Sequence, residues 1–122
     1  MFIGHRFEAI CKTCLKELFF NGKMPFFAEN LGRWWGNNPV LKKQEEIDIV
    51  ALDEDNALFC ECKYTEDKFD ENQFKDLQDS ALCINRANKH FMIFSKNGVS
   101  DAVESKIKND DSYKVITIFD LF

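Results

Sequence analysis

Two apolar segments joined by a short polar turn constrain the fold of this chain more than any other feature. The segments are residues 45–52 and 57–64, and the pattern of each predicts a β-strand. Between them lie only Asp53-Glu54-Asp55-Asn56, and Asp and Asn are turn-forming residues. The sequence therefore predicts a β-hairpin whose turn is centred between Glu54 and Asp55.

This register brings charged side chains together on one face of the hairpin. Asp48 is predicted to face Glu61, and Glu46 to face Lys63, with the Cβ atoms of each pair about 4.5–5.5 Å apart. Two carboxylates at that distance repel, which should raise the apparent pKa of the pair and favour a cation between them. The other face is apolar and is predicted to face the core; it carries Ile47, Ile49, Ala51, Leu58, Cys60 and Cys62.

The rest of the chain predicts a single α/β domain over residues 1–122. A chain of 122 residues with 13 Phe and 2 Trp can bury one core. The expected order is αβββαβαβ, with helices flanking a central sheet. The predicted elements are a helix at 3–20, a strand at 26–35, the hairpin, a helix from Asp70 to about Asn85, a strand at 91–94, a helix capped by Ser100 or Asp101, and a strand at 115–119.

The expected location is the cytoplasm. The first residues have neither the apolar stretch nor the cleavage site of a signal peptide, and no apolar run reaches the roughly 20 residues of a membrane span.

Five Cys, an odd number, argue against a disulfide framework. Cys11-x-x-Cys14 could form half of a zinc site or a redox pair, but its helical spacing with Phe7, Ile10 and Leu18 favours core packing.

Four residues supply the groups that phosphodiester cleavage needs: Glu8, Asp48, Glu61 and Lys63. Glu8 borders the apolar stripe of the first helix, and Glu61-x-Lys63 places an acid and a cation on one strand face. Carboxylate oxygens bind Mg²⁺ or Mn²⁺, which polarises a phosphate and lowers the pKa of a bound water. A Lys ammonium can stabilise the developing negative charge. The predicted metal ligands are Asp48, Glu61, Glu8 and the backbone carbonyl of Cys62.

Three segments and the chain end carry a resemblance to a known superfamily. They are Arg33-Trp34-Trp35-Gly36, residues 45–51, residues 59–63 and Phe119-Asp120-Leu121-Phe122. With the predicted element order, they resemble the PD-(D/E)xK nucleases, which have the restriction-endonuclease-like fold with a central mixed sheet. The closer resemblance, over nearly the whole sequence, is to the C-terminal domain of a family of archaeal and bacterial AAA-type ATPases.

The resemblance implies a Mg²⁺- or Mn²⁺-dependent endonuclease acting on DNA. It assigns Asp48 as the first acid of the motif, Glu61 and Lys63 as its Glu-x-Lys, and Glu8 as the acid of the first helix. Ile47 stands where the superfamily name has Pro. The chain has no Gly-rich phosphate loop, so the ATPase module would lie upstream, and the domain is either part of a longer chain or stands alone.

Two functions stay open. The first is a nuclease that works as a homodimer, because one site cuts one strand. The second is a non-catalytic module that binds nucleic acid or docks to an AAA-type ATPase. The four chemical residues favour the first function, whereas the net charge of −5 favours the second.

Each group of candidate residues also has a structural interpretation. Asp48 and Glu61 could lie on a solvated sheet face beside an ordinary Glu46–Lys63 ion pair. Aromatic and basic groups interleave as they do on nucleic-acid surfaces, which predicts DNA contacts from Arg33, Trp35, Lys42 and Lys43. The alternative places one Trp in the core and the other at the sheet edge.

Overall fold

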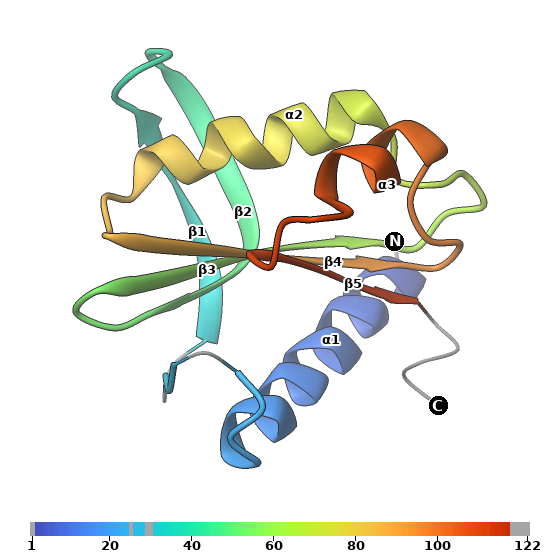
Figure 1. The fold of residues 1–122 in the computed structure, drawn as a ribbon, viewed down its shortest axis with the longest axis horizontal. Coiled ribbons are helices and arrows are strands. Elements are labelled where there is room, and N and C mark those ends of the chain that lie inside the picture. Colours follow the sequence, from blue (N-terminus) through green and yellow to red (C-terminus); the bar gives the residue numbers. More distant parts are fainter. Residues whose placement is uncertain (1, 25, 29–30, 118–122) are drawn as a thin grey trace.

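The computed structural model describes residues 2–24, 26–28 and 31–117, which follow the predicted order αβββαβαβ (Figure 1). The elements are α1 (Phe2–Phe20), β1 (Leu31–Asn38), β2 (Lys43–Leu52), β3 (Asn56–Lys63), α2 (Glu71–Ser80), the short 3-10 helix η1 (Ala81–Cys83), β4 (Asn88–Ser95), α3 (Asp101–Ile107) and β5 (Tyr113–Thr117). The expected α/β class is confirmed.

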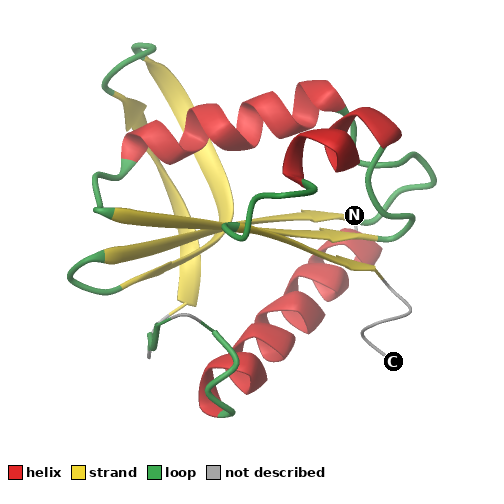
Figure 2. Ribbon diagram, in the orientation of Figure 1, coloured by secondary structure: helices red, strands yellow, loops and turns green. Residues whose placement is uncertain are grey.

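The sheet is mixed and lies between two layers of helix. Across the described residues it has five strands in the order β1-β2-β3-β4-β5. The pairs β1–β2 and β2–β3 are antiparallel, whereas β3–β4 and β4–β5 are parallel. Figures 1 and 2 show α2 and α3 on one face of the sheet and α1 on the other.

Each layer buries its own hydrophobic cluster. The cluster on the α1 face is built on Phe7, Cys11, Leu15 and Phe19, one helical turn apart, so Cys11 is a core residue as predicted. Ile10, which was expected on the same apolar stripe, is instead 37% exposed. The cluster on the opposite face packs α2 and α3 onto the sheet. The continuous apolar run of β4 serves both, because Met92 and Phe94 belong to the first cluster and Phe91 and Ile93 to the second.

Some predicted boundaries are displaced. Asp70 does cap α2, in a capping box with Gln73, but the α-helix ends at Ser80 and continues only as η1. β1 begins at Leu31 rather than at Phe26. β5 covers Tyr113–Thr117, and the predicted residues 118–119, like the chain-end segment of the resemblance, lie outside the described residues.

A β-bulge in β2 overturns one expectation about the core. The β1–β2 register shifts by one residue between Gly32 and Trp34, so β2 carries an extra residue in the stretch of Asp48 and Ile49. A bulge reverses the alternation of side chains beyond it. Ile47 is therefore fully buried on the α2 face, and the prediction that it shares a face with Ile49 is wrong.

Candidate active site

The two predicted acids meet where strands β2 and β3 part. The predicted hairpin register is confirmed as far as the two strands pair, and the ladder ends with Ile49 opposite Cys60. Asp48 and Glu61 are the next residues on either side. From this point β2 continues its pairing with β1, while β3 continues with β4 (Figure 1). The bulge of β2 lies at the same place, next to a candidate site, as bulges often do.

Asp48 is oriented by the backbone of the facing strand. Its Oδ2 accepts a hydrogen bond of 3.0 Å from the N–H of Cys62. Burial raises the pKa of Asp48, and the Glu8 carboxylate raises it further, while the Cys62 N–H and the Arg33 charge lower it. The site therefore holds Asp48 in place and disfavours its ionisation when no cation is present.

Glu61 is perturbed more strongly. Burial raises its pKa to about 8, and the charge of Asp48 and a side-chain hydrogen bond with Asp48 contribute to the rise. Two acids in such contact titrate as a pair, so near neutral pH they hold a proton between them. A divalent cation can replace that proton, because either species neutralises the repulsion.

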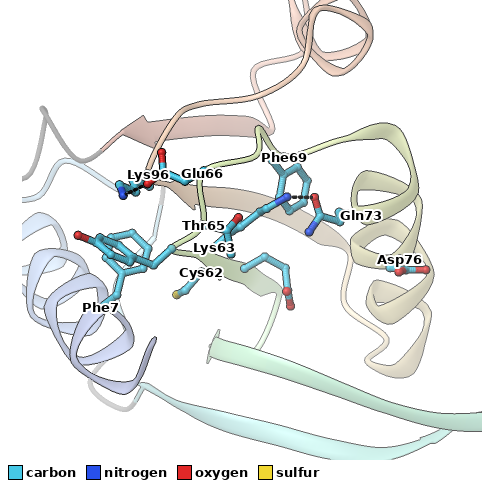
Figure 3. A pocket seen from close by; sticks show the side chains of 11 residues that line it. Phe7, Cys62, Lys63, Thr65, Glu66, Phe69, Gln73, Asp76 and Lys96 are labelled. Carbon is cyan, nitrogen blue, oxygen red and sulfur yellow. Dashed lines mark hydrogen bonds and ion pairs between the residues drawn. The ribbon is translucent and has the colours of Figure 1, made fainter. Parts of the chain in front are cut away.

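Lys63 follows Glu61 by two residues on β3 and lines the same pocket, but its ammonium group is held by Gln73 of helix α2. Its Nζ donates to Gln73 Oε1 at 2.7 Å (Figure 3). It also donates to the backbone carbonyl of Lys68 at 3.0 Å. The prediction that Lys63 faces Glu46 is wrong, because β2 has already left β3 at that point. Glu46 pairs with Trp35 in the β1–β2 ladder and makes an ion pair with Arg33.

Glu8 reaches the site from α1, as predicted. It lines a hollow of about 240 Å³ together with Asp48, Arg33 and Lys12. Its carboxylate is engaged, however, because Arg33 Nη2 lies 2.6 Å from Glu8 Oε1. Hydrogen bonds to Glu8 and Glu46 raise the pKa of Arg33.

A larger pocket, of about 750 Å³, opens beside Glu61 and Lys63. Figure 3 shows that its walls come from β3, the loop that follows it, α2 and α1. Lys96 also lines it and lies over the ring of Tyr64, 5.0 Å from the centroid. The pocket gives a substrate access to the side of β3 that carries Glu61 and Lys63.

The donor set fits a magnesium-like cation. In the part of the chain that the structure describes, no group of three or more His, Cys, Asp or Glu side chains is placed to hold a metal ion. Asp48 and Glu61 do form a carboxylate pair, and Mg²⁺ commonly takes one or two carboxylates and keeps several waters. The backbone N–H of Cys62 donates to Asp48. A role of the Cys62 carbonyl as a metal ligand stays a prediction.

The predicted nucleic-acid contacts are scattered. Trp34 packs against the core, while Trp35, on the edge strand β1, is 69% exposed, which confirms the structural interpretation of the Trp pair. Lys42 lies in the turn between β1 and β2 and Lys43 begins β2, and neither lines the pockets that contain Asp48 and Glu61. Arg33 does lie in the site. Contacts of all four predicted residues with DNA stay predictions.

Two features of the site were not foreseen from the sequence. The sequence predicts Gln73 as part of a capping box but does not predict its contact with Lys63. The bridge that Arg33 makes between Glu8 and Glu46 was also missed. Neither contact leaves a local signal, since each joins elements that are distant in the sequence.

Two comparisons with known proteins give a match to this chain. The model of a family described as archaeal and bacterial proteins of unknown function, DUF234, matches residues 1–79, which include all the candidate acids. An uncharacterized protein of Methanocaldococcus jannaschii is 30% identical over 115 residues, which cover 89% of this chain and 24% of that relative. The chain thus spans about a quarter of the length of this relative.

No solved structure gives a significant match to the chain. Within the described residues, no helix combines the length and the apolar character that crossing a membrane requires.

Proposed function

The chain belongs to the DUF234 family of archaeal and bacterial proteins, and we propose that it is a metal-dependent nuclease that cleaves phosphodiester bonds in DNA. The observation that carries the proposal is the meeting of Asp48 and Glu61 where β2 and β3 part, with Glu61 and Lys63 lining one pocket. The arrangement resembles that of the PD-(D/E)xK nucleases, and this resemblance supports the proposal. Burying two carboxylates together is costly, so a cation-dependent role explains their arrangement better than a structural one does.

In this proposal the acids form the cation site. A bound Mg²⁺ or Mn²⁺ polarises the scissile phosphate and lowers the pKa of the attacking water. Asp48 and Glu61 give up their shared proton and offer carboxylate oxygens. The Cys62 N–H fixes one oxygen of Asp48, so the other oxygen can bind without reorientation once the proton shared with Glu61 has left.

Lys63 stabilises the negative charge that develops on the phosphate. Its ammonium group has three N–H donors, and two of them are used by Gln73 and the Lys68 carbonyl. Both acceptors are neutral, so the positive charge of Lys63 is not cancelled by these contacts. The third donor is the one that we assign to a phosphate oxygen.

We also place the protein in the cytoplasm, as a homodimer on DNA. The described cysteines are free, which fits a reducing compartment. One site of this kind cuts one strand, so cleavage of a duplex requires two chains.

A plasmid-nicking assay with Mg²⁺ and with Mn²⁺ tests the proposal. Asp48→Asn, Glu61→Gln and Lys63→Ala should each abolish nicking. Glu54→Gln, which neutralises an exposed acid of the same hairpin, should nick like the wild type. Equal nicking by all variants would assign the activity to a contaminant and reject the proposal.

The length of the relative favours a second candidate function. Since the match covers 24% of that relative, a domain of this kind works there beside other parts of a longer chain. A module that binds nucleic acid or docks to an AAA-type ATPase domain would need no turnover. DNA binding without nicking in either metal would support this function over the first.

A further inference from the structure

Arg33 joins two acids that come from different layers of the molecule. Its Nη2 contacts Glu8 of α1 at 2.6 Å, and its Nη1 contacts Glu46 of β2. The Arg33 side chain is 35% exposed, so its guanidinium can move without opening the core. It is therefore a bridge at the surface of the site rather than a packed structural residue.

Arg33 lies where it would compete with a bound cation for Glu8. It lies in β1 opposite the bulge that contains Asp48, and both residues line the same hollow as Glu8. A cation that recruits Glu8 together with Asp48 competes with Arg33 for Glu8, since two positive groups on one carboxylate repel each other.

We propose that Arg33 is a phosphate-binding residue that Glu8 and Glu46 hold until a divalent cation takes Glu8. Released from Glu8, Arg33 donates to a non-bridging oxygen of a substrate phosphate near the scissile bond. The planar fork of a guanidinium matches carboxylate and phosphate equally, so the two Glu side chains stand in for phosphate oxygens. The inference rests on the proposed nuclease function and deepens it.

The exchange makes cation binding and phosphate binding cooperative. A cation that releases Arg33 raises the affinity for DNA, and DNA that engages Arg33 releases Glu8 for the cation. Because such coupling is reciprocal, it can be measured from either side.

Calorimetric titration with Mn²⁺ alone tests the first half of the exchange. Arg33→Ala should bind Mn²⁺ about tenfold more tightly than the wild type, because the cation no longer has to displace a charge-assisted hydrogen bond. The gain should vanish when Glu8 is absent: the double variant Glu8→Gln/Arg33→Ala should bind Mn²⁺ no more tightly than Glu8→Gln alone. Lys12→Ala is the matched control: it removes the same charge from the same hollow, but Lys12 has no ion pair among the described residues.

Fluorescence anisotropy with a labelled DNA oligonucleotide tests the second half. The measurement uses the Lys63→Ala background, in which the proposed cleavage is blocked and the partners of Arg33 are intact. Mn²⁺ should tighten DNA binding about tenfold when Arg33 is present and less than about twofold when it is replaced. Arg33→Gln, which keeps most of the side-chain length, replaces Arg33→Ala in both experiments if the alanine variant does not fold.

The outcomes separate this inference from the proposed function. If the wild type binds Mn²⁺ and nicks DNA, but replacement of Arg33 changes neither the Mn²⁺ affinity nor the coupling, the exchange is wrong and the nuclease stands. A gain that persists without Glu8, or that Lys12→Ala reproduces, also overturns the exchange. If the wild type binds no Mn²⁺ at millimolar concentration, both the function and the exchange fall.

Discussion

The pKa of Glu61 predicts that the metal-free protein loses stability as the pH rises toward 8. Glu61 has a pKa of about 8 in the folded state, against the ordinary Glu value of 4.5 that applies to the unfolded chain. The folded state therefore binds more protons than the unfolded state between these values. The contribution of Glu61 is fully present below pH 4.5 and is lost as the pH rises through 8.

The magnitude follows from the size of the shift. A rise from 4.5 to about 8 corresponds to about 5 kcal/mol at most, at about 1.4 kcal/mol per pKa unit. That is comparable with the whole free energy of unfolding of many small domains, about 5–15 kcal/mol. We expect a loss of about 2–5 kcal/mol between pH 5 and pH 9, because Asp48 shares the proton and titrates together with Glu61.

Glu61→Gln should remove this pH dependence. Glutamine resembles the protonated acid and can donate to Asp48, but it does not titrate. The variant should match the wild type near pH 5 and exceed its stability by about 2–5 kcal/mol at pH 9. The assay is urea denaturation with chelator at a series of pH values, with Glu54→Gln as the control for a lost surface acid.

Parallel stability curves for the wild type and Glu61→Gln would refute this reasoning, because they would mean that Glu61 titrates normally in the fold. A variant that is clearly less stable at every pH would mean that the Glu61 carboxylate is a structural anchor. With Mn²⁺ at pH 8, the wild type should gain stability and the variant should not, since the binding term belongs to the native site.

Three further predictions concern the same site. Mn²⁺ binding near pH 7 should release about one proton from the Asp48–Glu61 pair, and calorimetry in buffers of different ionisation enthalpy counts it; no release would mean that the pair is already ionised. Lys63→Ala should lower the nicking rate by at least about 100-fold while changing the Mn²⁺ affinity less than twofold; loss of the fold would instead indicate a structural lysine. Gln73→Ala should destabilise the protein by about 1 kcal/mol, through the weakened cap of α2, and also slow nicking; a stability loss with unchanged nicking would leave Gln73 only its capping role.

Local patterns were sufficient to predict most of the fold. The turn residues of the β2–β3 hairpin set a register that holds as far as Ile49 and Cys60. Asp70, three residues before Gln73, marked the start of α2, and the apolar run of β4 marked a strand buried on both faces. Each of these signals is formed by residues that are close together in the chain, so a single sequence is enough to recognise it.

The errors arose where a third element decides the outcome. The bulge near Asp48 depends on the pairing of β2 with β1, which hairpin spacing does not reveal. Glu46 and Lys63 were expected to pair, but each found a partner from another element, Arg33 in β1 and Gln73 in α2. The acids were placed correctly because they lie next to the last paired residues, where the register still holds.

The separation of β2 from β3 also explains how the fold tolerates the repulsion between Asp48 and Glu61. In a continuous ladder, Asp48 and Glu61 would be one more cross-strand pair with like charges, which is unfavourable. Where the ladder stops, the Cys62 N–H becomes available to Asp48 instead of to the backbone of β2. The sheet thus loses backbone pairing at one position and supplies a donor that orients an acid. The same geometry keeps the Asp48–Glu61 pair protonated near neutral pH when no cation is bound, and it leaves two carboxylates ready for a cation. The protein is therefore least stable under the conditions in which the proposed chemistry needs the pair ionised.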